Sequence, residues 1–365
     1  MTYKTRNLDY QQDKSFLSDA VRQYLSDASL SGDIIKWNYE CNPLKNANGQ
    51  VLEFIDDAAK SSKAGVISIV YRNMNCLHKR YQVALCGNFI VFPDHRSLQP
   101  AIKLVKEAVQ AVMESCPFIY GFPNDKAVGV LKMAGFKVIG KMVRYVYILR
   151  TGKYIYDATK IPYISYIVGG AFDLIRNSIV HLIDLSRIRC LHIEETKKFS
   201  VDINDILEKS VLSRLIINTH HNEYLNWRYF ARPGKNYMGV VIRDKNTKRP
   251  SALAVLEKDI NNQVLHIRDI VISDSNSFKA LLSAVRLWSY KHNVTSISMS
   301  VLCPDFVVDM VRSSGFVQRE STRYVCVKAA NKEMAIMMTD SLVFISIYKK
   351  PVLRIFNNYC GMHSL

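Results

Sequence analysis

The stretch that decides the fold is FIVFPDHRSLQPAI, residues 89–102. Its first four residues are apolar and favour a strand, and Pro93 and Asp94 then favour a turn. A helix is expected from Pro100, because proline is favoured at the start of a helix. Such a turn gathers backbone N–H groups at the helix start, with Arg96 beside them. The stretch therefore predicts an anion site that suits a pyrophosphate.

An internal repeat organises the rest of the chain. Trp37 and Tyr39, in WNYECNP, are matched by Trp227 and Tyr229, in WRYFARP. Gly-Phe and then Arg-Tyr-Val follow in both copies, at 135–136 and 144–146 and again at 315–316 and 323–325. We therefore expect two copies of one domain, at residues 1–150 and 200–330. A helical linker, 151–199, would join them, and residues 331–365 would form a C-terminal extension.

The two copies have a similar order of expected elements. The first combines helices at 13–27, 100–113 and 125–134 with strands at 66–71, 81–92, 118–121 and 136–149. The second combines strands at 238–243, 251–256, 263–272, 296–301 and 319–327 with helices at 278–292 and 305–313. Hairpins followed by alternating helix and strand predict an α+β fold, a mixed sheet with helices on both faces.

Apolar residues recur at helical spacing between positions 164 and 183. This pattern predicts an amphipathic linker helix packed against both domains. A helix lying on a membrane surface is the alternative, but the basic polar face that this role prefers is absent. No segment approaches the roughly 20 apolar residues of a membrane-spanning helix, and the first residues do not resemble a secretory signal. A cytoplasmic protein is expected.

The composition narrows the class of partner. The chain has 365 residues, with 49 Lys and Arg against 32 Asp and Glu, a formal net charge of +17. This excess is spread along the chain, which makes nucleic acid a weaker expectation. The charge alone narrows the partner only to something anionic, because the same field attracts small anions, nucleotide-like ligands, RNA and acidic lipid. The eight cysteines are scattered without CxxC spacing, so we expect reduced thiols and no zinc site. The adjacent His220 and His221 point in different directions, and no metal is expected there.

With these residues in place, the chain resembles the GCN5-related N-acetyltransferase superfamily, in the tandem-domain form associated with bacterial surface-polysaccharide clusters. That family's acyl-CoA loop reads V-x-P-x-x-R-x-x-G-x-G/A. Val91, Pro93, Arg96 and Ala101 match it, whereas Gln99 replaces the middle glycine. The later signature N-x-x-A-x-x-x-Y-x-x-x-G-F matches at Asn124, Ala127, Gly135 and Phe136, whereas Leu131 replaces the tyrosine. The second copy keeps Gly-Phe but lacks the loop arginine and glycines.

The resemblance implies two tandem domains of this fold and direct acyl transfer, acetyl being the expected group, from acyl-CoA to an amine. Two splayed strands would hold pantetheine, and a backbone N–H after Phe89 would polarise the thioester oxygen. The second copy, its loop degenerate, would build the acceptor side. The implied acyl-CoA contacts in the first copy are Ile90, Val91, His95, Arg96, Ser97, Leu98, Gln99, Pro100, Ala101 and Asn124.

The attacking amine must lose a proton, so a base is needed. The expected acyl strand offers no Glu, so its only polar side chain, Asn88, is a catalytic candidate and the base is expected elsewhere. Asp269 is the other candidate, because a carboxylate on an apolar strand face is costly unless it is paired or functional. A buried hydrogen bond or an ion pair to Arg228 is the structural alternative for Asp269. The expected substrate contacts are Trp227, Arg228, Tyr229 and His266, although the Trp-x-Tyr pairs also suit a packing role.

Three functions follow from these observations. The first is an N-acyltransferase acting on an amino sugar, expected to be nucleotide-linked, or on a similar small amine. The second is a Fem-like transferase that uses aminoacyl-tRNA, which the basic excess permits. The third is a non-catalytic binding protein, favoured by Gln99 and Leu131. A monomer or a homodimer is expected.

Overall fold

The computed structural model describes residues 2–24, 31–44, 47–76, 79–210, 217–218, 221–341 and 344–345. The first copy contains strands β1 (Thr2–Asn7), β2 (Ala47–Ile55), β3 (Ser61–Cys76), β4 (Lys79–Val91), β5 (Phe118–Gly121) and β6 (Lys137–Ile148). Its helices are α1 (Tyr10–Tyr24), α2 (Ser31–Tyr39), α3 (Leu98–Met113) and α4 (Asp125–Met133). The expected helix at 13–27 corresponds to α1, and positions 25–27 lie outside the described residues.

The second copy repeats this order after a helical linker, α5 (Gly152–Thr159) and α6 (Pro162–Ile188). Its strands are β7 (Leu191–Thr196), β8 (Ile217–Asn218), β9 (Tyr237–Asp244), β10 (Pro250–Asp259), β11 (Val264–Ile272), β12 (Ser296–Leu302) and β13 (Val317–Ala329). Its helices are α7 (Asn204–Lys209), α8 (Asn222–Leu225), α9 (Ser275–Lys291) and α10 (Asp305–Ser313). Helix α11 (Lys332–Ser341) and strand β14 (Phe344–Ile345) follow. The predicted α+β class, a mixed sheet flanked by helices, is confirmed.

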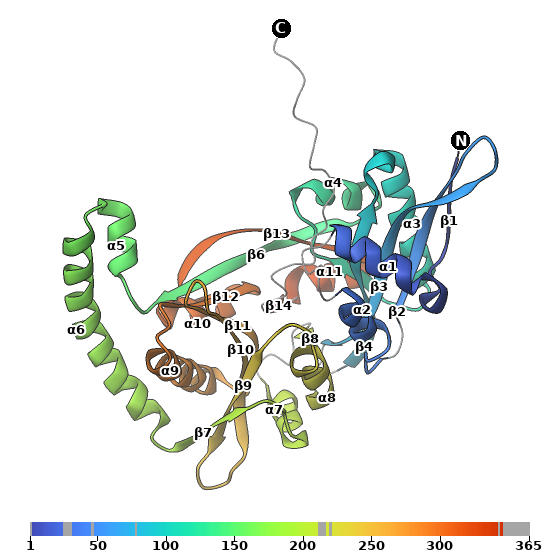
Figure 1. The fold of residues 1–365 in the computed structure, drawn as a ribbon. Helices are drawn as coiled ribbons and strands as arrows, with labels where there is room; N and C mark the ends of the chain where they lie inside the picture. Colours follow the sequence, from blue (N-terminus) through green and yellow to red (C-terminus); the bar gives the residue numbers. More distant parts are fainter. Residues whose placement is uncertain are drawn as a thin grey trace.

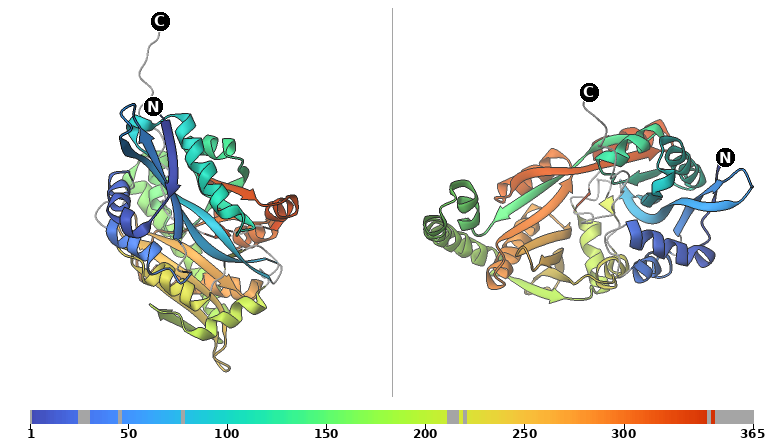
Figure 2. Two further views of the ribbon diagram at one scale, coloured as in Figure 1. Left: turned by 90° about the vertical axis from the view of Figure 1, so that its right-hand side faces the viewer. Right: turned by 45° about the horizontal axis from the view of Figure 1, so that its top comes forward.

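The two copies share one continuous sheet because they exchange their last strands. The order is β1-β2-β3-β4-β5-β13-β6-β12-β11-β10-β9-β7. Strand β5 therefore pairs with β13 of the second copy, and β12 pairs with β6 of the first. The two exchanged strands also pair with each other, and they run from one half of the molecule to the other (Figures 1 and 2). No sheet edge separates the copies, so the domain limits at 150 and 200 stay a prediction.

The repeated tryptophans meet where the two halves face each other. The rings of Trp37 and Trp227 stack with centroids 4.8 Å apart and planes 18° from parallel. Each indole Nε1–H donates to the other residue's backbone carbonyl, at 2.8 Å from Trp37 and 3.0 Å from Trp227. Both side chains are buried. The arrangement is reciprocal, as an approximate two-fold axis between two copies of one domain requires.

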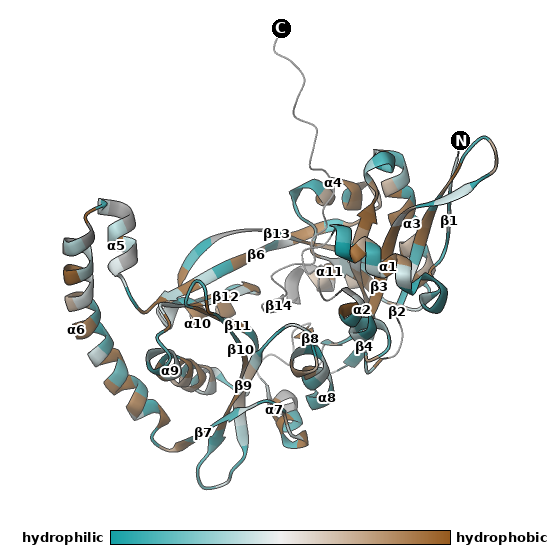
Figure 3. Ribbon diagram, viewed as in Figure 1, coloured by the Kyte–Doolittle hydropathy of each residue, from teal (hydrophilic) through white to brown (hydrophobic). Residues whose placement is uncertain are grey.

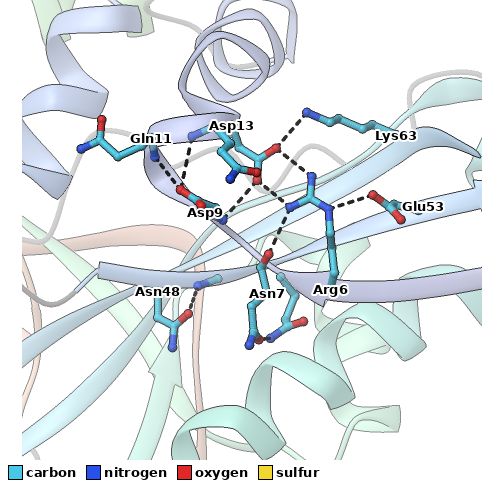
Figure 4. Close-up of polar contacts among 11 residues, drawn as sticks. Arg6, Asn7, Asp9, Gln11, Asp13, Asn48, Glu53 and Lys63 are labelled. Carbon is cyan, nitrogen blue, oxygen red and sulfur yellow. Dashed lines mark hydrogen bonds and ion pairs between the residues drawn. The ribbon is translucent and has the colours of Figure 1, made fainter.

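A buried carboxylate fixes α1 against the sheet of the first half. Asp13 accepts hydrogen bonds from both terminal nitrogens of Arg6, at 2.7 and 2.8 Å, and from Lys63 Nζ at 2.8 Å (Figure 4). Arg6 lies on β1 and Lys63 on β3, so one side chain ties a helix to two strands. The bonds from Arg6 hold the pKa of Asp13 well below its usual range, although burial opposes them.

The linker helix forms as predicted, but the expectation that its apolar side packs against the domains is wrong. Helix α6 lies against α5 and α9 (Figure 1). Its large apolar side chains are mostly exposed, and Asp184 is among its buried residues. Apolar spacing revealed that the helix has an apolar side, but it could not say whether the protein itself covers that side.

Candidate active site

The candidate site begins where two neighbouring strands separate. Strands β4 and β5 run parallel and pair only at Ala84 with Ile119 and Leu85 with Tyr120. Beyond these pairs β4 continues for six residues to Val91, whereas β5 ends at Gly121. No strand of the described chain pairs with this part of β4 on its β5 side. The backbone of β4 after Leu85 is therefore available to pair with an extended ligand.

A β-bulge changes the direction of the β4 backbone after Leu85. Ser68 of β3 faces Gly87, and Val66 faces Ile90, so β4 carries one more residue than β3 between these pairs. The bulge contains Asn88, whose φ is +42°, a conformation that asparagine tolerates better than most residues. Bulges commonly lie next to active sites because they change the direction of a strand. Asn88 thus lies at the point where the split opens.

The predicted anion loop follows directly. A short 3-10 helix covers Pro93–His95, and α3 starts at Leu98, two residues earlier than expected. The N–H groups of Leu98 and Gln99 have no intrahelical partner, as at the start of any helix. No side chain caps α3 in their place. Arg96 Nε donates to the Val91 carbonyl at 3.0 Å, and its guanidinium lies 5.6 Å from the centre of the Tyr24 ring. Its two terminal nitrogens bond to no described residue, which leaves them available to a phosphate.

The other predicted acyl-CoA contacts divide into two groups. Ser97, Leu98 and Gln99 are exposed at the helix start, whereas Ile90, Val91, Pro100 and Ala101 are buried beneath it. His95 Nδ1 lies 3.2 Å from the Tyr3 hydroxyl, so this ring is turned toward β1. Asn124 caps α4 by accepting a bond from the Ala127 N–H at 2.9 Å. Direct contact of any of these residues with a cofactor stays a prediction.

The corresponding site of the second copy is closed by the chain itself. Strands β11 and β12 also pair in parallel and then separate, after Ile267 and Met299. Strand β14 pairs with Val301 and Leu302 of β12 and lies against β11, so it occupies this second split. Asp274 caps α9 by accepting bonds from the backbone of Asn276 and Ser277, both at 2.8 Å. A carboxylate therefore occupies the helix start that corresponds to the predicted anion loop of the first copy.

Leu131 lies at the inner end of the first split. A Cβ added to Gly121 would be 3.5 Å from Cys86 Cβ and 3.7 Å from Leu131 Cδ2, so these three residues face one another between β4 and α4. Leu131 is fully buried and has no proton to give. Burial raises the pKa of the Cys86 thiol to about 12, which keeps it protonated at neutral pH. Neither side chain is therefore an acid or a nucleophile under ordinary conditions.

Two hydroxyl groups that the sequence reasoning missed lie behind the bulge. Ser68 is fully buried, and its Oγ would be 3.7 Å from a Cβ added to Gly87. The Tyr39 hydroxyl is buried near it, and neither group has a well-formed hydrogen bond within the described part of the chain. Burial raises the pKa of the Tyr39 phenol, and the Ser68 hydroxyl opposes this shift only in part. The repeated Trp-x-Tyr motif was the available signal for Tyr39.

Asp269 lies at a matching bulge in the second copy. Strand β11 has one extra residue, Arg268, where Leu256 faces Ile267 and Val255 faces Asp269. The Tyr229 hydroxyl donates to Asp269 Oδ2 at 2.7 Å, and the N–H of Ile270 donates to Oδ1 at 3.0 Å. Burial raises the pKa of the Tyr229 phenol well above its usual value, which keeps it a donor. Tyr39 and Tyr229, the matched tyrosines, thus both lie at a bulge.

The structure does not bring all the predicted site residues together. Four strands separate β4, with Asn88, from β11, with Asp269 and His266. Trp227, Arg228 and Tyr229 are all buried. Trp227 packs on Trp37 of the first half, and the Arg228 guanidinium donates to the Tyr224 hydroxyl at 2.7 Å. Their predicted contact with substrate stays a prediction, as does the catalytic role of Asp269.

A separate cavity of about 940 Å³ lies under the linker helix. Side chains of α6, the β10–β11 turn and the end of α9 line it, among them Asn177, Gln263 and Tyr290. It is remote in the fold from the β4–β5 split and from the α3 loop (Figure 1). Within the residues that the structure describes, no group of three or more His, Cys, Asp and Glu side chains is arranged to hold a metal ion.

The fold is that of the GCN5-related N-acetyltransferases. One similar structure is a probable N-acyltransferase from Enterococcus faecalis V583, with a TM-score of 0.63 and 10% sequence identity. Another is a GCN5-related N-acetyltransferase from Anabaena variabilis, with a TM-score of 0.57 and 14% identity. Each match covers 90% of this chain and 73% of the other. The chain also matches a fungal multi-domain GH3 β-N-acetylglucosaminidase with a GCN5-related glucosamine N-acetyltransferase region (TM-score 0.53, 11% identity), over 89% of this chain and 38% of that one. No family profile and no curated protein matches the sequence. The resemblance inferred from the loop motifs is thus confirmed at the level of fold.

Proposed function

We propose that the protein is an N-acyltransferase that binds acyl-CoA in its first copy only. The observation that carries this proposal is the contrast between the two strand splits. The first split is unpaired and leads to an uncapped helix start with Arg96 beside it. The second is filled by β14, and its helix start is capped by Asp274. Only the first offers both an edge for the pantetheine arm and a place for the pyrophosphate of CoA.

In this proposal the bulge at Asn88 supplies the electrostatic part of catalysis. Pantetheine pairs with β4 after Leu85, which puts the thioester next to the bulged backbone. A backbone N–H there stabilises the negative charge that develops on the thioester oxygen when the amine attacks. The C–S bond then breaks, and the acyl group stays on the amine nitrogen while the CoA sulfur leaves as a thiolate. A fixed donor of this kind is worth about 10²–10³-fold in rate.

Proton transfer is assigned to groups other than Leu131. The amine proton must go to a base, and Asp269 remains the candidate base named from the sequence. Asn88 remains a catalytic candidate as a hydrogen-bonding group, because an amide does not accept the proton of an amine. Tyr39 and Ser68 are added here, because two buried hydroxyl groups beside the bulge can relay a proton between the reacting atoms and solvent. Without a tyrosine at position 131, water protonates the leaving thiolate, and a slow reaction is expected because general-acid help is worth about 10²–10⁴-fold.

The proposed acceptor is an amino sugar, expected to be nucleotide-linked. The formal net charge of +17 favours an anionic substrate. One structural neighbour contains a region named a glucosamine N-acetyltransferase, which supports this class of acceptor. The acyl group is expected to be acetyl, and we place the reaction in the cytoplasm.

The test is CoA and acetyl-CoA binding by calorimetry, followed by turnover with a panel of nucleotide amino sugars. Wild type should bind both cofactors and turn over slowly. Tyr39→Phe should keep CoA affinity and lose about tenfold or more in turnover if the hydroxyl relays a proton. Leu131→Tyr should raise turnover, because it restores a donor next to the thiolate.

Three other outcomes would change the mechanism or the function assigned here. Unchanged turnover in Asp269→Asn would remove that residue from the mechanism. RNA binding with steep salt dependence and no CoA binding would favour the aminoacyl-tRNA alternative. Absence of both would leave a non-catalytic binding protein.

A further inference from the structure

Helix α6 is oriented with its polar side toward the protein. Asp184 is fully buried and accepts hydrogen bonds from Arg286 Nε at 2.8 Å and from Ser283 Oγ at 2.7 Å, both on α9. Asp173 accepts a bond from the Thr151 hydroxyl at 3.0 Å. Arg176 and Asn177 each donate to the Leu149 carbonyl at 3.0 Å. These four residues are the polar anchors that hold α6 in place.

The opposite side of α6 is apolar and exposed. Ile167, Ile175 and Phe172 are 71%, 66% and 54% exposed, and Val168 and Ile179 are also more than half exposed. Hydrophobic segments mark the helix along its length in Figure 3. At roughly 150–200 Å² for each large side chain, the exposed fractions of these five residues amount to roughly 450–600 Å² of apolar surface, as much as the largest patch on an ordinary monomer. The largest apolar patch of a typical monomer is about 300–600 Å².

Exposed cations gather where α6 ends. Arg187 and Arg189 form its last turn and the following residue, and both are exposed. The β9–β10 turn lies against this end, because the N–H of Lys245 donates to the Cys190 carbonyl at 3.1 Å. Lys245, Lys248 and Arg249 of that turn are also exposed. At the other end of α6, Lys160 is exposed as well.

We propose that α6 docks on the surface of an anionic lipid membrane. The polar anchors already hold one side of the helix to the protein, and a bilayer can cover the exposed apolar side at once. The basic cluster would meet the lipid phosphates, each cation near an anionic surface adding to the attraction. The sequence of α6 lacks the basic polar face that is typical of a membrane-surface helix. The structure explains this lack, because the polar side of α6 faces the protein and the exposed cations lie at its two ends. No helix of the described chain is long and apolar enough to cross a membrane, so this contact is peripheral.

A second copy of the chain is the competing occupant. Two copies with a formal net charge of +17 each repel one another, and this repulsion disfavours a dimer and favours an anionic bilayer. A two-helix contact also covers a narrower strip than the exposed side of α6.

The experiment is vesicle flotation of the full chain at about 0.15 M salt. Vesicles of phosphatidylcholine with about 30% phosphatidylglycerol should bind at least about tenfold more protein than pure phosphatidylcholine. The triple variant Phe172→Gln, Ile175→Gln, Ile179→Gln should lose this binding. Its matched control, Met133→Gln with Val201→Gln and Ile336→Gln, changes three apolar residues that are 47%, 70% and 57% exposed outside α6 and should bind as wild type.

The charge contribution has its own control. Lys248→Glu with Arg249→Glu should weaken binding about tenfold or more, whereas Lys4→Glu with Lys60→Glu makes the same change in net charge far from α6 and should have little effect. In addition, the tryptophan fluorescence that Phe172→Trp adds should be quenched by vesicles that carry brominated acyl chains. Only contact with the lipid interior brings the bromine close to the added indole.

The proposal is overturned if wild type does not float with anionic vesicles. It is also overturned if light scattering shows a dimer that the triple variant dissociates, because α6 would then bind a second copy. Circular dichroism of each variant excludes misfolding as the cause of lost binding.

Discussion

Arg96 is the residue whose position most directly supports a cofactor role. It is held by one bond to the Val91 carbonyl, and its two terminal nitrogens stay available beside the uncapped start of α3. A guanidinium is suited to a pyrophosphate because it presents several donors in one plane.

Arg96→Ala is therefore expected to weaken CoA binding by about 1–3 kcal/mol, the worth of a charge-assisted contact. Calorimetric titration with CoA measures the change. Asn276→Ala is the matched control in the second copy and should leave the affinity unaltered. If Asn276→Ala were the damaging change, CoA would bind in the second copy.

At the scale of elements, Asp13 joins α1 to two strands, so its charge is part of the stability of the first half. Its pKa lies well below the usual range because Arg6 bonds to the ionised form. A carboxylate with a lowered folded-state pKa contributes stability above its unfolded pKa, and loses it as pH falls through the folded pKa.

Asp13→Asn should lower the free energy of unfolding by about 2 kcal/mol at pH 7, below the value for fully buried pairs because Arg6 and Lys63 are partly exposed. The difference in the free energy of unfolding between wild type and this variant should be about 1 kcal/mol smaller at pH 3, where the Asp13 carboxyl of the unfolded wild type is protonated. Urea unfolding at both pH values measures it, with the exposed Asp19→Asn as control. Equal losses at both pH values would contradict a charge effect.

The elements themselves could largely be predicted from the sequence. The loop at residues 89–102 gave the strand, the turn and the helix, because each of these depends on local residue preferences. The bulge at Asn88 could not be predicted, since it depends on the register between β3 and β4. The packing of the linker helix could not be predicted either, because the spacing of apolar residues is the same whether the apolar side faces a core or lies exposed.

Over the whole molecule, the exchange of β6 and β13 could not be predicted either. Both strands follow a Gly-Phe pair and carry Arg-Tyr-Val, so their patterns suit either neighbour equally. The choice between them depends on contacts far apart in the chain. For the same reason, nothing in the local sequence showed that β14 would fill the second split.

One continuous sheet should unfold as one unit. We expect a single calorimetric transition, although the chain contains two copies of the fold. Leu104→Ala in the first half and Leu282→Ala in the second, both buried, should each cost about 2–5 kcal/mol and shift that same transition. Two peaks that move separately would show that the halves are independent.

The exchanged strands also set the order in which the protein is completed during synthesis. When β5 leaves the ribosome, the strand that will pair with its free edge has not been made. About 200 residues separate the end of β5 from the start of β13, which is roughly 10–40 s of translation. During that time the edge of a nascent sheet is exposed, and such edges recruit strands from other chains. The first half of this protein therefore depends on its own C-terminal region to be finished.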